Sequence, residues 1–141
     1  MMARWAFLGF AAALCLAACA SAPTPPAHAN IRQIVSTTSF GMCVGYCTTR
    51  LEISEGRAVL VREARGGRGA PQNLQAQRFA TVLTPDEWDA IEHLAGTTDL
   101  SGLPPVIGCP DCADGGAESL TIEGAGEVQS ISFEYGAAVA Q

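Results

Sequence analysis

The sequence contains no lysine, and its eight arginines stand against fourteen carboxylates, giving a net charge of -6. The segment 85–141 contains neither Lys nor Arg. Nucleic acids and anionic bilayers attract proteins through clustered positive charge, so this balance argues against both kinds of partner. Six arginines gather between Arg50 and Arg78, and we interpret this stretch as the solvated face of a hairpin.

Histidine is also scarce, since the chain has only His28 and His93. Hydrolytic catalysis needs a nucleophile, a base and an orienting group close together, and no motif in the sequence supplies them. We interpret His28 as a solvated residue of a tether and His93 as a partly exposed helix residue. The sequence therefore predicts a non-catalytic protein without a cofactor.

No apolar run approaches the roughly 20 residues that a membrane-spanning helix needs. The run at 6–16 has eleven residues and follows Arg4, a pattern typical of a secretory signal. The residues Leu-Ala-Ala-Cys at 16–19 resemble the lipobox of bacterial lipoproteins. The resemblance implies cleavage before Cys19 and lipid on its sulfur and amino group. The alternative is an ordinary signal peptide and a soluble periplasmic product.

The leader divides the chain into three parts. Residues 1–18 are the expected lipoprotein signal peptide, 19–30 a Pro/Ala-rich tether, and 31–141 a single domain. Ala20 and Ser21 follow the anchor cysteine where inner-membrane lipoproteins often carry Asp. By analogy we expect a protein on the periplasmic face of the outer membrane, attached through its lipid anchor and able to contact another envelope protein.

Alternating apolar and polar residues predict the strands of this domain. Two hairpins are expected, one turning at Glu55-Gly56 and one at 124–126, with extended segments at 31–36 and 74–83 and a glycine-rich loop at 64–73. Thr84, Pro85 and Glu87 give the sequence of a capping box and predict one helix at about 84–95, with Trp88, Ile91, Leu94 and Ala95 facing inward. Together these patterns predict an α+β fold: a small antiparallel sheet of two hairpins plus one or two strands, with the helix on a face. Leu120, Ile122, Ile131, Phe133 and Tyr135 are expected to point into the core.

Four cysteines remain besides the anchor, spaced C-x3-C at Cys43 and Cys47 and C-x2-C at Cys109 and Cys112. An exported protein favours disulfides. Four thiolates could instead hold zinc if the pairs converge. A redox-active pair is the third possibility, because Cys109-Pro110-Asp111-Cys112 looks like the C-P-x-C of glutaredoxins. That chemistry uses a helix beginning at the motif, and the sequence 113–116 is a poor helix start.

Two disulfide pairings are open. Local bridges close very small loops and restrict the unfolded chain by about 2 kcal/mol each, whereas a bridge across the intervening residues would give about 4 kcal/mol. A straight strand holds residues i and i+4 about 13 Å apart, so a local bridge needs a curled turn. Gly45 permits that curl and Pro110 favours a turn, so we favour local pairing.

Two stretches resemble known sequences. The turn at 43–47 and the alternating 48–54 are similar to a bacterial domain-of-unknown-function family that begins with a Cys-x-Gly-x-Cys turn. The string at 108–118, GCPDCADGGAE, resembles a group of uncharacterised lipoproteins. The likeness covers about 36–135 and implies no activity. Those relatives continue into a further helix, which implies a less covered face of the sheet in this chain.

We expect no metal site, although Asp111, Asp114 and Glu118 offer the carboxylate oxygens that calcium prefers. Their spacing does not fit an EF-hand loop. The leading prediction is thus a lipid-anchored envelope protein with a disulfide-stabilised, non-catalytic binding or structural domain. The alternative is a thiol-disulfide redox or zinc-handling protein that uses the same four cysteines.

Overall fold

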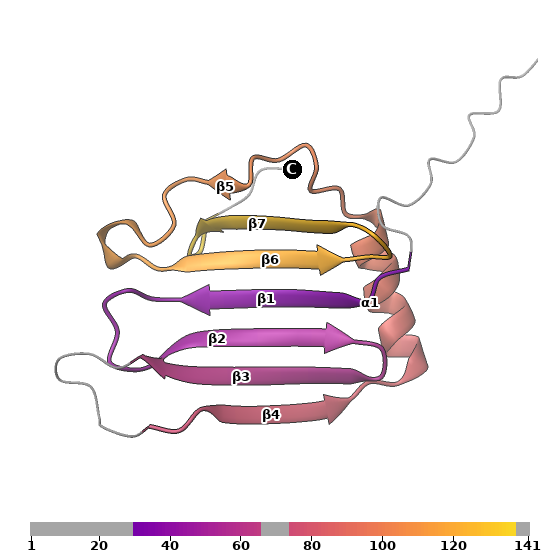
Figure 1. Ribbon diagram of the computed structural model, residues 1–141, viewed down its shortest axis with the longest axis horizontal. Helices are drawn as coiled ribbons and strands as arrows, with labels where there is room; N and C mark the ends of the chain where they lie inside the picture. The colour runs from indigo at the N-terminus through magenta and orange to yellow at the C-terminus, as the bar shows by residue number, and fades with distance from the viewer. Residues whose placement is uncertain (1–29, 66–73, 138–141) are drawn as a thin grey trace, which may run out of the picture.

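The computed structural model describes residues 30–65 and 74–137, which form one seven-stranded mixed sheet and one α-helix (Figure 1). In chain order the elements are β1 (Gln33–Ser39), β2 (Gly45–Ser54), β3 (Arg57–Arg65), β4 (Gln77–Val82), α1 (Pro85–Thr97), β5 (Val106–Ile107), the short 3-10 turn η1 (Cys112–Asp114), β6 (Ala117–Glu123) and β7 (Val128–Glu134). The predicted turns at Glu55-Gly56 and 124–126 connect β2 to β3 and β6 to β7. The predicted loop at 64–73 lies mostly outside the described residues.

The predicted fold class is wrong, because the protein is mostly sheet rather than a small two-hairpin α+β domain. The strand order is β4-β3-β2-β1-β6-β7-β5. Strand β1 lies between the two hairpins and pairs with β2 on one side and β6 on the other along its full length. Strand β5 adds a parallel pair at one edge, where the Ser132 N–H donates to the Pro105 carbonyl at 2.9 Å. The two hairpins are therefore halves of one continuous sheet.

Helix α1 begins with the predicted capping box. The Thr84 hydroxyl accepts from the Glu87 backbone N–H, and the Glu87 carboxylate accepts from the Thr84 N–H at 2.8 Å. Trp88 and Ala95 are buried and Ile91 is partly buried, as the spacing predicts. Leu94 is 70% exposed, so the prediction that it faces inward is wrong. The helix buries a narrow stripe rather than a broad face.

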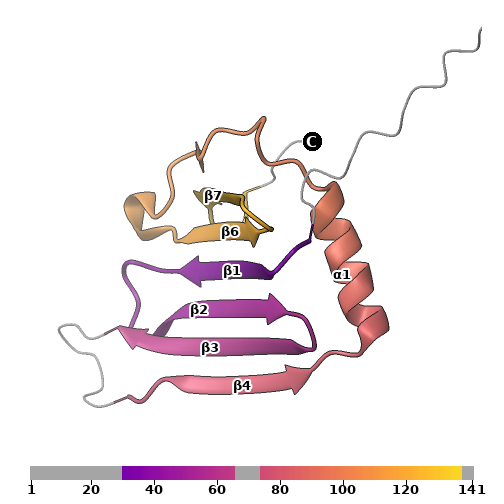
Figure 2. The same ribbon diagram turned by 45° about the vertical axis from the view of Figure 1, so that its right-hand side comes forward.

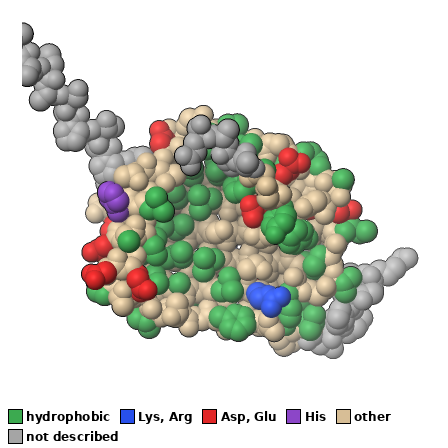
Figure 3. All heavy atoms as spheres, turned by 180° about the vertical axis from the view of Figure 1, so that it is seen from behind, with side chains coloured by type: hydrophobic (Ala, Val, Ile, Leu, Met, Phe, Trp, Pro, Cys, Tyr) green, Lys and Arg blue, Asp and Glu red, His purple; other side chains and the backbone are tan. Residues whose placement is uncertain are grey.

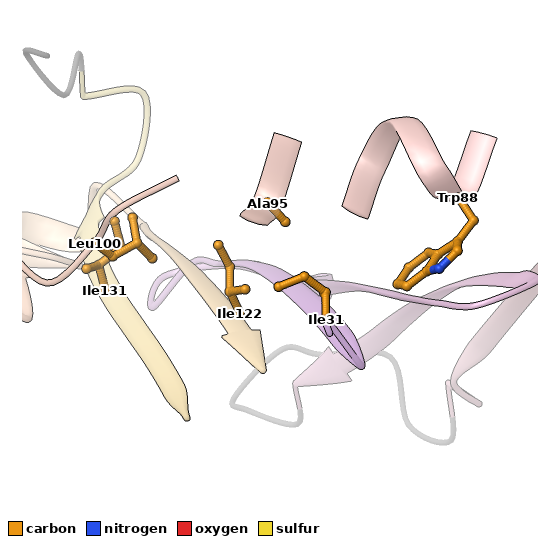
Figure 4. Close-up of a cluster of buried hydrophobic side chains, with 6 residues drawn as sticks. All are labelled: Ile31, Trp88, Ala95, Leu100, Ile122 and Ile131. Atoms are coloured by element: carbon orange, nitrogen blue, oxygen red, sulfur yellow. The ribbon is translucent and has the colours of Figure 1, made fainter. Parts of the chain in front are cut away.

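The helix crosses one face of the sheet at the end where β1 begins (Figures 1 and 2). Ile34 is paired directly with Ile53 and Ile122, so these three side chains share that face. Figure 4 shows the buried cluster between helix and sheet, made of Ile31, Trp88, Ala95, Leu100, Ile122 and Ile131. The cluster that packs against α1 thus lies at one end of the sheet.

The same face extends beyond the helix. Figure 3 shows hydrophobic side chains spread across this part of the surface. Leu51, Leu60 and Phe79 line a shallow hollow of about 170 Å³ there, and Phe79 is 54% exposed. On the opposite face, Arg50 and Glu52 form a salt bridge at 2.7 Å. None of the helices in the described residues has the length and apolarity needed to cross a bilayer.

The capping box predicts a specific pH dependence. The hydrogen bonds from the Thr84 backbone and side chain lower the pKa of Glu87 from its usual 4.5. A carboxyl whose folded pKa is depressed stabilises the fold above its ordinary pKa, and this stabilisation is lost as the pH falls through the lowered value. Urea unfolding between about pH 5 and about pH 3 should therefore show a shallower loss of stability in Glu87→Gln than in the wild-type protein. Asp89→Asn on the same helix is the control, and equal slopes for Glu87→Gln and the wild type would contradict the prediction.

Candidate functional site

Both cysteine pairs lie at one end of the sheet, opposite the end where β1 begins. Residues 40–47, the first cysteine loop, follow β1 and lead into β2. Residues 108–116, the second cysteine loop, lead into β6. Because Ser39 at the end of β1 pairs with Ala117 at the start of β6, the two loops emerge side by side. Adjacent antiparallel strands thus bring together segments that are about 60 residues apart in the chain.

The first cysteine loop is closed by the Cys43–Cys47 disulfide, with the two Cα atoms 5.5 Å apart. Gly45 provides the curl with a φ of 101°, a value that favours glycine. The Phe40 N–H donates to the Cys47 carbonyl at 3.0 Å, and Cys47 is only 1% exposed. One sulfur of this bridge is therefore inside the protein.

The second cysteine loop is closed by the Cys109–Cys112 disulfide, with the Cα atoms 5.4 Å apart. The Cys112 N–H donates to the Cys109 carbonyl at 3.0 Å, so a tight turn surrounds Pro110. Both cysteines are exposed, unlike Cys47. The structure therefore contains the two local pairs and a disulfide-stabilised domain.

A hydrogen bond joins the two loops. The Gly41 N–H donates to the Asp111 Oδ1 at 2.9 Å. A Cβ added at Gly41 would stand 2.6 Å from Asp111 Oδ2, closer than real Cβ contacts come. The first loop therefore needs glycine at this position for the carboxylate to reach its backbone.

An aromatic pair ties the first cysteine loop to the end of β7. Phe40 meets Tyr135 edge-on, with ring centroids 4.8 Å apart, a geometry worth about 1 kcal/mol beyond burial. The prediction that Tyr135 points into the core is wrong, because β7 ends at Glu134 and Tyr135 is 52% exposed. Gly116, with a φ of 93°, lies so close to the Phe40 ring that an added Cβ would come within 2.6 Å. The Gly41–Asp111 hydrogen bond and the close approach of Gly116 to Phe40 make the two loops one braced unit.

This unit presents apolar side chains to solvent. Met42 is 78% exposed and Val44 is 67% exposed, and they flank Cys43 in sequence. A disulfide-closed loop loses little conformational entropy when it binds a partner. Exposed apolar residues on a rigid loop are a reasonable binding surface.

The geometry of the two cysteine pairs also bears on the alternatives of a metal site and of a redox-active thiol pair. The sulfur atoms of each pair are bonded to each other, so they are not thiolate ligands. Within 30–65 and 74–137, no three His, Cys, Asp or Glu side chains come together to hold a metal ion. Asp111 accepts from Gly41, Asp114 is exposed on η1, and Glu118 lies in β6, half-buried. The 3-10 turn η1 begins at Cys112 and has only three residues, with Ala113 at a φ of 51°, so no α-helix begins at the C-P-x-C motif.

The remaining candidate residues lie apart from this unit. His93 is exposed on α1, at the other end of the sheet. Cys19 lies outside the described residues. Sequence reasoning missed the roles of Gly41, Gly116 and the Asp111 carboxylate in joining the loops. The glycines next to Phe40 and before Ala117 were the only signals of this close approach.

No family model matches the chain, and no curated protein shows significant similarity to it. The site must therefore be interpreted from its own geometry.

Substituting Gly116 tests the packing of the two loops. Gly116→Ala adds a side chain at a positive φ and pushes a methyl group into Phe40, so we expect a loss of about 2 kcal/mol in the free energy of unfolding. Gly126→Ala is the matched control, because its φ of 103° imposes the same backbone strain and nothing lies within 4 Å of the added methyl. Urea denaturation should rank Gly116→Ala as clearly the more destabilised variant. Equal losses would mean that the Phe40 contact is absent.

Proposed function

We propose that the protein is an exported, lipid-anchored and non-catalytic domain that binds another envelope protein through the end carrying the two cysteine loops. The observation that carries this proposal is the braced unit itself: two disulfide-closed loops joined by the Gly41–Asp111 hydrogen bond, with Met42 and Val44 exposed. Such an arrangement favours recognition, because the bridges and the hydrogen bond fix the surface before a partner binds.

The point at which the chain enters the domain supports a binding end that is remote from the membrane. The described chain begins at Asn30, at the end of the sheet opposite the cysteine loops. A lipid on Cys19 would therefore attach at that opposite end. The eleven residues between the anchor cysteine and Ile31, residues 20–30, would span about 34 Å if they were extended, and the ten-residue strand β2 adds about 33 Å. The proposed binding end would stand tens of ångströms from the membrane and face away from it.

The anchoring part is tested by expressing the full chain in a Gram-negative host and analysing the mature N-terminus by mass spectrometry. We expect cleavage before Cys19, acylation of that cysteine and recovery in the outer-membrane fraction. The Cys19→Ser variant should lose the lipid and leave that fraction. Full-length material recovered from the cytosol would contradict the export and the anchor together.

The binding part is tested by photo-crosslinking in intact cells. A photoreactive residue at Met42 should give a discrete adduct to one envelope protein. Val128 is the matched control, because it is 64% exposed and lies at the opposite end of the sheet. The Met42 adduct should disappear in Gly116→Ala, which displaces the first loop without touching position 42. Adducts from position 128, or equal adducts from both positions, would overturn the assignment of the binding end.

A further inference from the structure

The two disulfides differ in how far a thiol can reach them. In the first bridge Cys47 is 1% exposed and Cys43 is half-buried, whereas Cys109 and Cys112 are both exposed. A hollow of about 250 Å³ adjoins the second bridge and is lined by both of its cysteines together with Gly116, Glu134 and Tyr135. Thiol-disulfide exchange requires a thiolate to approach one sulfur directly, so access decides which bridge reacts. We propose that Cys109–Cys112 is a selectively reducible bridge and that its reduction releases the first cysteine loop.

The second cysteine loop also holds an unfavourable backbone. Asp111, Ala113 and Asp114 have φ values of 60°, 51° and 59°, in the left-handed region. Aspartate tolerates this region, but for alanine the left-handed conformation is unfavourable, because its Cβ crowds the following carbonyl oxygen. Of the three, Asp111 lies within the ring that the bridge closes, so opening the bridge removes a covalent constraint on its backbone.

The reaction is a two-electron exchange with a dithiol. One thiolate of the dithiol attacks a sulfur of the bridge, forms a mixed disulfide and expels the other cysteine as a thiolate, which takes up a proton. The second thiol of the reductant loses its proton and attacks the reductant's first sulfur in the mixed disulfide. The remaining cysteine leaves as a thiolate and takes up a proton. The products are the Cys109 and Cys112 thiols and a cyclic disulfide of the reductant.

The charge around the bridge selects the kind of dithiol. Asp111 and Asp114 belong to the same loop, and Glu134 lines the hollow. The residues that line the hollow include no Lys or Arg to balance them. An anionic thiol is therefore repelled relative to a neutral or cationic one. The chemistry fits a neutral or cationic dithiol, or the cysteine pair of an exchange protein with a basic active-site surface.

The consequence of opening follows from the Asp111 contact. This residue stands between the two bridged cysteines, and its carboxylate holds the Gly41 N–H. When the bridge opens, Asp111 loses the conformation that aims its side chain at Gly41. The Met42 side of the first loop is then released, while its own Cys43–Cys47 bridge stays closed. This regulatory step rests on the proposed binding end, but its chemistry does not.

The test is a reduction series on the purified mature protein with dithiothreitol, dithiobutylamine and dimercaptopropanesulfonate, which are neutral, cationic and anionic. Samples are quenched with iodoacetamide and mapped by mass spectrometry. We expect Cys109 and Cys112 to be alkylated at least about tenfold faster than Cys43 and Cys47. After normalising each rate to an unstructured Cys-Pro-Asn-Cys peptide disulfide, the amine should be fastest and the sulfonate slowest. Glu134→Gln should reduce the difference in normalised rate between the cationic and the anionic dithiol.

Amide hydrogen exchange then measures whether opening the second bridge releases the first cysteine loop. With only the second bridge open, exchange of the Gly41 amide should rise about tenfold, while amides of β1 stay protected. Cys109→Ser/Cys112→Ser should show the same change without reductant, and Asp111→Ala should show it with both bridges intact. Simultaneous opening of both bridges, or an unchanged Gly41 amide after selective opening, would overturn the inference. Neither readout involves a binding partner, so failure of the proposed function would leave these results unaltered.

Discussion

Thr37→Pro is expected to lower the free energy of unfolding by about 3 kcal/mol or more, because it breaks the central strand of the sheet. Thr37 pairs with Arg50 in β2 and with Ser119 in β6. A proline there removes a ladder hydrogen bond and crowds the neighbouring backbone. The expected loss should appear as a large shift of the urea midpoint.

Ala80→Pro on β4 is the matched control. Strand β4 is the edge of the sheet, and the Leu83 N–H donates inward to the Gly56 carbonyl at 3.1 Å. By alternation the Ala80 N–H points outward, where proline removes no ladder bond. We expect a loss of about 1 kcal/mol or less for this variant. Comparable losses for Thr37→Pro and Ala80→Pro would contradict the strand order.

Trp88→Ala should cost about 3–5 kcal/mol, the range for removing a large aromatic side chain from a core. Trp88 is 7% exposed and belongs to the cluster between α1 and the sheet (Figure 4). Because α1 supplies only this narrow stripe, little other apolar surface can close the resulting cavity.

Leu94→Ala is the control on the same helix. Leu94 is 70% exposed, so its truncation should change the free energy of unfolding by about 0.5 kcal/mol or less. Thermal unfolding of the two variants under one set of conditions distinguishes them. A large loss for Leu94→Ala would mean that the helix packs with a different face.

Local chemistry explains which elements the sequence could predict. The capping box at Thr84 and Glu87 is a contact between residues three apart, and it marks where α1 begins. Alternation along β2, β3, β6 and β7 likewise depends on neighbouring residues, as do the two tight turns. These elements were found close to their observed bounds.

Strand order could not be predicted, because it depends on pairing between distant segments. The sequence of 33–39 does not indicate that this strand pairs with both β2 and β6. It could equally have been an edge strand that pairs with only one of the two hairpins. The two-residue β5 follows two prolines and has too few residues for a pattern. Tyr135 continues the alternation of Phe133, but the strand ends before it and its ring meets Phe40.

The sequence predicted the two disulfides of the candidate site but not the noncovalent contacts between its two loops. Spacing indicated local bridges at Cys43–Cys47 and Cys109–Cys112, both of which the structure contains. For Asp111 we considered a calcium site, which we did not favour, but not a contact with the first cysteine loop, whose Gly41 N–H donates to its carboxylate. That contact arises from the adjacency of β1 and β6, so a correct strand order was needed to foresee it.

Disulfide mapping of the native mature protein tests the braced unit most directly. Trypsin cuts after Arg32, Arg50 and Arg78 and has no later site, so each local pair lies within one peptide, 33–50 or 79–141. Without reductant, and after alkylation of any free thiol, we predict two unlinked peptides, each two hydrogens lighter than its reduced form. A covalent link between the two peptides, or alkylated cysteines in either of them, would contradict the account.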